Sequence, residues 1–260
     1  MKSLKLPQRN QRGHKGTFGT VLVIGGADGK LSMLGGPVLA ALAAYRIGAG
    51  KVVVAVPGSL VHSALELLPE SLVFDYNNDK ILASEAKNAT SVVIGPGWGY
   101  GESQVRVLKN ILSLHKPTVI DADALNIICK DEDVASFVHN LCILTPHPGE
   151  FNRLSEALKV QSPRQLAQKL GAVVVYKDST TVITDGKQDY EHDRPNSRLA
   201  IAGSGDVLSG IIGGLQAQFS NEISPFDIAK LGVNIHSNAG DRLKAGGLAH
   251  ELADVINMVE

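Results

Sequence analysis

The chain has 260 residues, 44% of them hydrophobic, which is enough for one large domain with a sizeable core. Its formal net charge of -1 and sequence pI of about 6.7 argue against a nucleic-acid-binding or membrane-surface protein, which needs clustered basic charge. No apolar run reaches the length of a spanning helix, and the basic stretch 2–15 contains no apolar core of a secretory signal, so we expect a cytoplasmic protein with one domain over residues 1–260.

Short apolar runs alternate with helical stretches along the first two thirds of the chain. Such runs are typical of strands buried on both faces of a parallel sheet. The predicted strands are Thr20–Ile24, Lys51–Val56, Ser91–Ile94, Thr118–Asp121, Leu141–Leu144 and Ala172–Tyr176. The predicted helices between them are Gly36–Ile47, Leu60–Leu67, Ser103–Leu114, Ala124–Cys129 and Pro163–Leu170. This alternation predicts an α/β layered fold whose central, mostly parallel sheet is flanked by helices.

The last third of the chain has a different pattern. Thr181–Thr184 and Gln188–Glu191 flank the dipeptide Asp185-Gly186, which is a hairpin turn signal. We therefore expect a small antiparallel edge after the parallel strands. The remaining predicted elements are helices, at Asp206–Gln218, Pro225–Leu243 and Leu248–Met258.

Glycine-rich or polar loops follow several of the predicted strands, at 25–29, 95–99, 121–123 and 145–150. In an open α/β sheet, ligands bind outside the carboxyl ends of the strands. These loops therefore predict one composite site at that edge. Two common nucleotide motifs are absent from the sequence. Gly48-Ala-Gly50-Lys51 lacks the spacing and the following Ser or Thr of a P-loop, and the alternating glycines at 95–101 do not fit the dinucleotide fingerprint.

The turn Gly203-Ser204-Gly205-Asp206 opens an apolar helical run. Glycines let backbone N–H groups approach a ligand, and a helix start adds unpaired N–H donors and a positive dipole end. The turn is thus a candidate anion hole, and Asp206 a candidate base for a nearby hydroxyl. Together they favour phosphoryl transfer to an alcohol. The alternative is an ordinary helix start in which Asp206 is the N-cap.

Three further motifs carry candidate site residues, each with a plainer alternative. Asp121, Asp123 and Asn126 suit a water-coordinated Mg²⁺, unless Asp123 only caps the next helix. His147 lies between two prolines that fix its backbone for substrate binding, unless it is a surface turn residue. Lys177 is a candidate phosphate ligand in a strand-to-strand turn, unless it lies at a solvated hairpin tip.

Taken together, these blocks resemble the ADP/ATP-dependent NAD(P)H-hydrate dehydratases of the ribokinase-like superfamily, almost from end to end. The most specific pair is Asp121-Ala-Asp123-Ala-Leu-Asn126 and Thr145-Pro-His147-Pro-Gly-Glu150. The resemblance implies repair of hydrated nicotinamide cofactors: (6S)-NADHX or NADPHX is phosphorylated from ADP or ATP with Mg²⁺, and phosphate elimination regenerates NADH or NADPH. It also implies a ribokinase-like layered fold.

The resemblance assigns roles to individual residues. Asp206 would be the base, and the backbone of Gly203, Ser204 and Gly205 the anion hole. The hydrate would contact Gly36, Gly99, His147 and Asp206. The nucleotide would lie on Gly205 and on Lys177, Asp178, Ser179, Thr180 and Thr181, where the family's usual Lys-Gly-Ala-Gly-Thr has lost two glycines. It further implies a homotetramer and a separate hydrate epimerase, since no epimerase domain precedes this one.

Two other interpretations are compatible with the same turn. A ribokinase-like vitamin or sugar kinase would use it and release a stable phosphorylated product. A non-catalytic nucleotide sensor would account for the altered loop 177–181, but it has no need of the base Asp206. The blocks around Asp121 and His147 favour the dehydratase.

Overall fold

A nine-stranded sheet runs through residues 11–256, the part of the chain that the computed structural model describes. Across the sheet the strands lie in the order β3-β2-β1-β4-β5-β6-β7-β8-β9. The neighbouring strands from β3 to β7 in this order pair in parallel. Strand β8 pairs antiparallel with both β7 and β9. The mostly parallel sheet with a small antiparallel edge is therefore confirmed. The strands are β1 (Thr20–Ile24), β2 (Lys51–Val56), β3 (Leu72–Asp75), β4 (Ser91–Ile94), β5 (Thr118–Ile120), β6 (Cys142–Leu144), β7 (Val173–Tyr176), β8 (Thr181–Thr184) and β9 (Asp189–His192).

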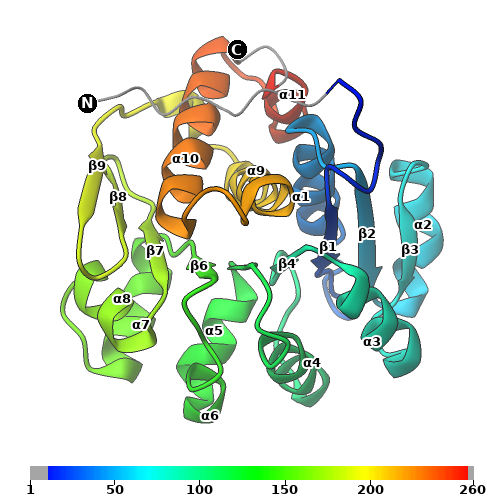
Figure 1. The fold of residues 1–260 in the computed structure, drawn as a ribbon, viewed down its shortest axis with the longest axis horizontal. Helices are drawn as coiled ribbons and strands as arrows, with labels where there is room; N and C mark the ends of the chain where they lie inside the picture. The colour runs from blue at the N-terminus through cyan, green and yellow to red at the C-terminus, as the bar shows by residue number, and fades with distance from the viewer. Residues whose placement is uncertain (1–10, 257–260) are drawn as a thin grey trace.

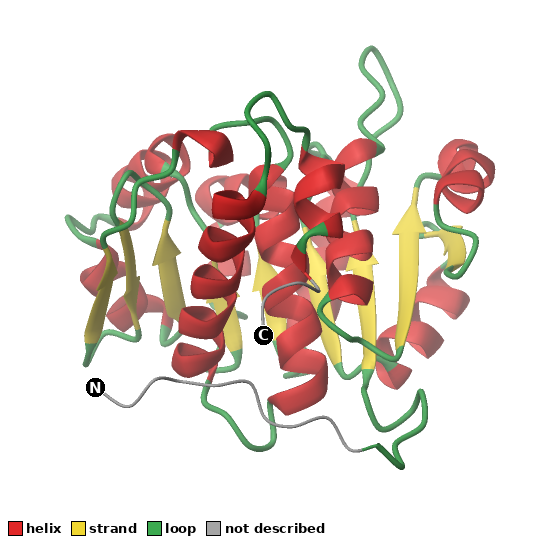
Figure 2. Cartoon of the chain, turned by 90° about the horizontal axis from the view of Figure 1, so that it is seen from above, coloured by secondary structure: helices red, strands yellow, loops and turns green. Residues whose placement is uncertain are grey.

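Helices cover both faces of the sheet. Figure 1 shows α1, α9, α10 and α11 on one face and α3 to α8 on the other. The arrowheads of most strands point to the same edge, where the loops that follow them gather (Figure 2). The helices are α1 (Gly35–Arg46), α2 (Val61–Leu67), α3 (Asp79–Asn88), α4 (Glu102–Leu112), α5 (Asp123–Lys130), α6 (Glu132–Ala135), α7 (Pro148–Leu158), α8 (Pro163–Leu170), α9 (Ser204–Phe219), α10 (Pro225–Arg242) and α11 (Ala249–Asp254).

The sequence prediction misses some elements and extends others. Strand β3 lies at the sheet edge with Leu72 56% exposed, so it lacks the continuous apolar run of a central strand. Helix α3 has few apolar residues and was not predicted. The predicted loop 145–150 is wrong in its second half, because α7 begins at Pro148. The last predicted helix ends earlier, at Asp254, and its final residues 257–258 and the basic residues 2–10 lie outside the described part.

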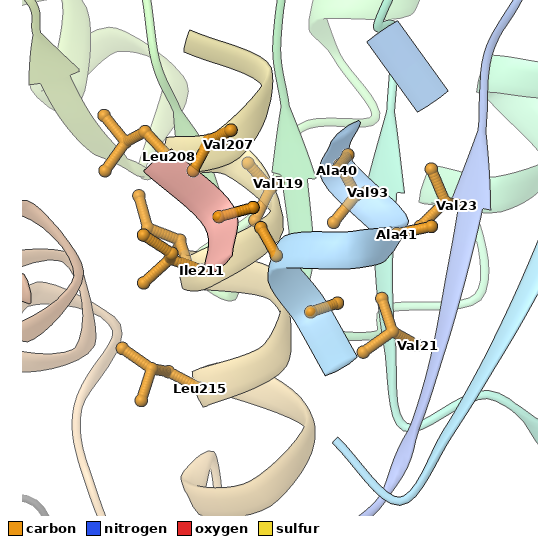
Figure 3. Packing of buried hydrophobic residues seen from close by; sticks show 14 of the residues in the cluster. Val21, Val23, Ala40, Ala41, Val93, Val119, Val207, Leu208, Ile211 and Leu215 are labelled. Atoms are coloured by element: carbon orange, nitrogen blue, oxygen red, sulfur yellow. The ribbon is translucent and has the colours of Figure 1, made fainter. Parts of the chain in front are cut away.

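The packing of α9 on α1 and the sheet fixes where the start of α9 lies. Valines of β1, β4 and β5 face small residues of α1 and the apolar side of α9 (Figure 3). A methyl group on Gly210 would lie 2.2 Å from the Ala40 carbonyl oxygen, and one on Gly213 would lie 2.3 Å from Val93 Cγ2. These glycines cost helix propensity, but they allow α9 to pack at backbone contact with its neighbours.

Among the described helices, none combines the length and apolar character needed to cross a lipid bilayer.

Candidate functional site

Helix α9 begins with a backbone conformation that glycine favours. Its N-cap is Gly203, with φ of 89°, and Asp206 lies inside the first turn. The N-cap interpretation of Asp206 is therefore wrong. The first-turn N–H groups of a helix have no intrahelical acceptor, and the dipole places partial positive charge at the same end. The start of α9 has the geometry of an anion-binding site.

We expect Gly203→Ala to destabilise the protein more than Gly246→Ala. Both glycines have positive φ, of 89° and 78°, so both substitutions incur about 1 kcal/mol of left-handed strain. At Gly203 the new methyl would also lie 2.4 Å from Leu39 Cδ1, whereas nothing lies within 4 Å at Gly246. Chemical denaturation of the two variants measures the difference. Equal losses of unfolding free energy would show that the contact with Leu39 relaxes without cost.

Lys177 lies beside this helix start and is paired with a buried carboxylate. Its Nζ is 3.0 Å from Asp121 Oδ1, and the two side chains are 19% and 3% exposed. A methyl group on Gly205 would lie 3.2 Å from the same Nζ. Burial alone lowers the pKa of Lys177, but the carboxylates of Asp121 and Glu150 outweigh burial and raise it. The interpretation of Lys177 as a solvated hairpin-tip residue is therefore wrong, and its charge lies beside the start of α9.

Asp206 has the electrostatics of a base that works near neutral pH. Burial, together with the nearby carboxylates of Asp121 and others, raises the pKa of Asp206 to about 7, although Lys177 opposes the shift. A methyl group on Gly36 would lie 3.3 Å from Asp206 Oδ1. Gly36 thus leaves one side of this carboxylate free of side-chain atoms. A base with a pKa close to the working pH is the most effective proton acceptor.

His147 is the N-cap of α7. Its Nδ1 accepts hydrogen bonds from the backbone N–H of Gly149 and Glu150, at 3.0 and 3.4 Å. The backbone N–H of His147 donates to Glu150 Oε2 at 2.9 Å, which completes a capping box. With Nδ1 accepting, a neutral ring carries its proton on Nε2, which lies 3.5 Å from Glu150 Oε1. The half-exposed ring is thus both a cap and a candidate ligand-binding group.

Glu150 is a site residue that the sequence analysis did not single out. Its side chain is only 6% exposed. Burial raises its pKa overall, although the charge of Lys177 opposes the shift. Its charge interacts with Lys177, Asp121 and Asp206. The sequence signal was present in the block 145–150, but only the fold shows that this carboxylate is buried next to Lys177.

Asp123 and Asn126 connect neighbouring loops. Asp123 Oδ2 accepts a hydrogen bond from the Gly99 N–H at 2.7 Å, and Oδ1 accepts one from Asn126 at 3.1 Å. The Asn126 side-chain oxygen accepts from Arg153 at 2.8 Å. The N-cap of α5 is Ala122, so the interpretation of Asp123 as a cap is wrong. Within residues 11–256, no group of three or more His, Cys, Asp or Glu side chains is arranged as a metal-ligand cluster.

A cavity of about 510 Å³ opens beside the start of α9. Four residues of the predicted nucleotide loop line it, namely Lys177, Asp178, Ser179 and Thr181, and so do Ser204, Gly205 and His147. Thr180 is not in the lining, and its hydroxyl donates to Asp193 at 2.9 Å. Gly36, Gly99 and Asp206 also lie outside the lining. The fold therefore brings most of the predicted nucleotide residues into one cavity wall at the start of α9, and Asp206 interacts with Lys177 of that wall.

Three polar lining residues from β9 and α10 were not predicted as site residues: His192, His236 and Ser237. His236 Nε2 lies 3.0 Å from the Ser204 carbonyl oxygen and 3.1 Å from its hydroxyl. Because a carbonyl only accepts, Nε2 carries the proton. Burial lowers the pKa of His236 to about 4, so the ring stays neutral and holds Ser204 in place. No spacing in the sequence connects position 236 to position 204.

Comparison with known proteins gives a consistent result. The family model described as NAD(P)H-hydrate dehydratase matches residues 21–258. An ADP-dependent (S)-NAD(P)H-hydrate dehydratase of Neisseria meningitidis is 38% identical, over 94% of this chain and 86% of the relative. A bifunctional NAD(P)H-hydrate repair enzyme of Moorella thermoacetica is also 38% identical, over 91% of this chain, which spans 47% of that relative. The chain thus spans about half the length of such bifunctional relatives.

A solved structure extends the likeness to three dimensions. The ADP/ATP-dependent NAD(P)H-hydrate dehydratase of Bacillus subtilis, co-crystallised with ATP and Mg²⁺, superposes with a TM-score of 0.79 at 29% identity. The superposition covers 98% of this chain and 93% of that one. A ribokinase-like protein of Enterococcus faecalis has a TM-score of 0.86 at 26% identity, over 96% of this chain and 89% of that one. The expected ribokinase-like layered fold is thereby confirmed.

Proposed function

The chain belongs to the NAD(P)H-hydrate dehydratase family, and we propose that it converts (6S)-NADHX and NADPHX to NADH and NADPH with ADP or ATP as phosphoryl donor. One observation carries the proposal. The start of α9 places a carboxyl with a pKa of about 7 beside an anion site, a buried lysine and a cavity of nucleotide size. This arrangement suits transfer of a phosphoryl group to an alcohol.

The proposed reaction has two stages. Asp206 takes the proton of the hydrate hydroxyl, and the oxygen attacks the terminal phosphorus of the nucleotide while the bond to the bridging oxygen breaks. Backbone N–H groups at Gly203–Gly205 hold the transferring group, and Lys177 offsets its charge. In the second stage the carbon–oxygen bond breaks, phosphate leaves, and loss of a proton from the adjacent carbon forms the double bond. The net change is removal of water from the hydrate and of one phosphate from the nucleotide.

The proposed hydrate site is built around Asp206 at the edge of the cavity. Gly36 leaves space at Asp206 Oδ1, and the Gly99 N–H is fixed by Asp123. His147 lies in the cavity wall, with its Nε2 3.5 Å from Glu150 Oε1. These three residues and Asp206 form the substrate site that we propose, with the nucleotide on Gly205 and the loop 177–181.

Mg²⁺ fits the charge of this site, although no cluster of direct ligands is present among the described residues. Burial, with the charges of Asp121, Glu150 and Asp123, raises the pKa of Asp206, and Lys177 opposes the shift. A magnesium ion keeps several waters and needs few protein ligands. We propose that Asp121 and Glu150 hold its water shell next to the nucleotide phosphates, with Asp123 and Asn126 as support. When bound, the ion would neutralise charge on the phosphoryl group.

The pKa of Asp206 predicts the pH profile of the enzyme. Because only the ionised carboxylate accepts the proton, kcat/KM should be constant above pH 7 and fall by about tenfold per pH unit below it. Initial rates between pH 5 and pH 9 measure this dependence. The residual rate of Asp206→Asn is the control and should not show the same slope. A wild-type profile that stays flat down to pH 5 would mean that another group limits the reaction.

The direct test of the function is absorbance at the reduced-nicotinamide band. The protein is mixed with NADHX, Mg²⁺ and either ADP or ATP, and the two nucleotides are compared. A nucleotide-dependent rise is expected and identifies the phosphoryl donor. A flat trace with folded protein would contradict the proposal, and a stable phosphorylated product from a vitamin precursor would then identify a kinase.

The wider setting is also part of the proposal. We propose that the chain acts in the cytoplasm as one domain in a homotetramer, and that a separate epimerase interconverts the hydrate epimers. Sedimentation analysis of the purified protein tests the tetramer: a monomer at micromolar concentration would contradict it.

A further inference from the structure

The segment 193–203, which joins β9 to α9, contributes to the lining of the cavity. We call it the wall segment. It contains a short 3-10 helix, η2 (Ser197–Leu199), and its last residue, Gly203, is the N-cap of α9. Its residues in the cavity lining are Arg194, Asn196, Leu199, Ala200 and Ile201. The shape of the proposed nucleotide site therefore depends on where the wall segment lies.

The backbone of the wall segment is not hydrogen-bonded into the sheet. Among the described residues, its backbone–backbone hydrogen bonds run to its own residues or to the first turn of α9. A loop without ladder hydrogen bonds takes its position from side-chain hydrogen bonds and packing. The contacts that other elements make with its side chains therefore decide how well it is placed.

Asp241 of α10 is bonded to three residues of the wall segment. Its Oδ2 accepts a hydrogen bond from Arg194 Nη2 at 2.6 Å, and its Oδ1 accepts one from Asn196 Nδ2 at 2.9 Å. Its backbone carbonyl accepts from Arg198 Nη1 at 2.8 Å. Asn238 of the same helix accepts from Arg194 Nη1 at 2.8 Å. Both carboxylate oxygens of Asp241 are thus bonded to lining residues, although Asp241 itself lies outside the lining.

The wall segment also packs against the backbone of α10. A methyl group on Gly240 would lie 2.7 Å from Leu199 Cδ2 and 3.1 Å from Asn196 Nδ2. Asn196 is in turn the N-cap of η2, because its side-chain oxygen accepts from the Arg198 N–H at 3.0 Å. A shift of Asn196 away from Asp241 would therefore move η2 and the lining residue Leu199 with it.

The ion pair between Arg194 and Asp241 is suited to fix local geometry. The two side chains are 51% and 50% exposed, and ion pairs at such exposure contribute little to the stability of a whole protein. The planar guanidinium, however, is held at two nitrogens by two side chains of one helix, which fixes its direction. Loss of the network should therefore displace the wall segment without unfolding the chain.

We propose that Asp241 is a positioning residue of the nucleotide site, which acts by holding Arg194 and Asn196 in the cavity wall. The inference rests on the proposed function, since it assigns how one wall of the same site is held. A protein whose binding-competent state is only fractionally populated binds its ligand more weakly by that fraction. Bound nucleotide restores that state, so Asp241 acts on affinity and leaves the chemical step unchanged.

Asp241→Ala and Asp241→Asn test this role. Without the full network, the wall segment should keep its position in about a tenth to a third of the molecules, so ADP affinity falls about threefold to tenfold. The kcat at saturating ADP and the KM for NADHX should stay within about twofold of the wild type. Calorimetric titration of ADP and steady-state rates measure these quantities. Asp241→Asn is nearly isosteric and carries the test if Asp241→Ala does not fold. Unchanged or higher ADP affinity in the variants would overturn the proposal.

A reciprocal exchange distinguishes positioning from general destabilisation. In Asp241→Asn with Asn196→Asp, the amide at position 241 can donate to the carboxylate at position 196 and accept from Arg194. The Arg198 N–H keeps its acceptor, and the net charge is unchanged. Asn196→Asp alone places two carboxylates opposite each other and should weaken ADP binding. ADP affinity in the double variant should return to within about twofold of the wild type. Losses that add in the double variant would overturn the proposal.

Asp254→Ala is a matched control. Asp254 pairs with Arg46 at 2.6 Å, and the two side chains are 57% and 44% exposed. Neither residue lines the cavity, so the ADP affinity of this variant should equal that of the wild type. An equal loss of affinity in the control would overturn the role of Asp241. A wild type that binds ADP but does not convert NADHX would overturn the proposed function alone, and a wild type that binds neither ADP nor ATP would overturn both.

Discussion

Asp206→Asn should lower kcat at least about a hundredfold while the fold and nucleotide binding persist. Asparagine has nearly the same shape but cannot accept the hydroxyl proton. The carboxyl lies inside the first turn of α9 and is not its cap, so the substitution removes no cap hydrogen bond. The expected loss is therefore chemical and not structural. Steady-state rates with NADHX and ADP, combined with calorimetric ADP binding, measure both quantities.

The same variant should be more stable than the wild type at alkaline pH. The pKa of Asp206 is about 7 in the folded chain, well above the ordinary value of 3.8 for an aspartate. Proton binding therefore favours the folded state, and this contribution is lost as pH rises through about 7. An asparagine side chain stays neutral at every pH, so the variant does not lose this stability as pH rises. Thermal melting at pH 6 and pH 8.5 should show a larger gain for the variant at pH 8.5. Near-normal turnover, or a gain independent of pH, would contradict the role assigned to this carboxyl.

Lys177→Ala should combine a large loss of nucleotide affinity with a loss of stability. The substitution leaves the Asp121 carboxylate, which is 3% exposed, without its partner at 3.0 Å. Breaking a buried ion pair by removing one member costs about 3 kcal/mol. The KM for ADP should rise more than the KM for NADHX, because the lysine lines the cavity in which we propose that the nucleotide phosphates bind. Equal rises would mean that Lys177 is not a phosphate contact.

A double variant separates the two effects of Lys177. In Lys177→Met with Asp121→Leu, both members of the ion pair are removed, so part of the lost unfolding free energy should return, although Glu150 still lacks the lysine charge. The weak ADP binding should persist, because the positive charge is still absent. Chemical denaturation and ADP titration of the single and double variants complete the cycle. Recovery of ADP affinity in the double variant would show that Lys177 acts only through stability.

The sequence predicted the central strands because their physics is local. Continuous β-branched runs such as Lys51–Val56 and Ser91–Ile94 have the same boundaries in the structure. Such runs mark strands buried on both faces, whatever surrounds them. Strand β3 escaped prediction because an edge strand with an exposed Leu72 lacks that pattern. Its place is decided by pairing with β2, a contact between distant residues.

Some residues of the candidate site could likewise be identified from the sequence, whereas others could be found only from the fold. Gly203–Asp206 could be identified from the sequence, because a helix start, two glycines and a carboxylate lie within four positions. The pairing of Lys177 with Asp121 joins residues 56 positions apart, and the contact of His236 with Ser204 joins residues 32 apart. Neither has a signature in spacing, because side-chain contacts of this kind depend on strand order and on how α9 and α10 pack.

The sequence by itself therefore determined the chemistry that is available: an anion-binding turn, a base, a lysine and an α/β frame. The tertiary structure decided how that chemistry is tuned. Burying four interacting carboxylates near one lysine raises the pKa of Asp206, and burial is a property of the whole fold. It also brought Asp241 to Arg194 and Asn196, which no reading along the chain can reveal.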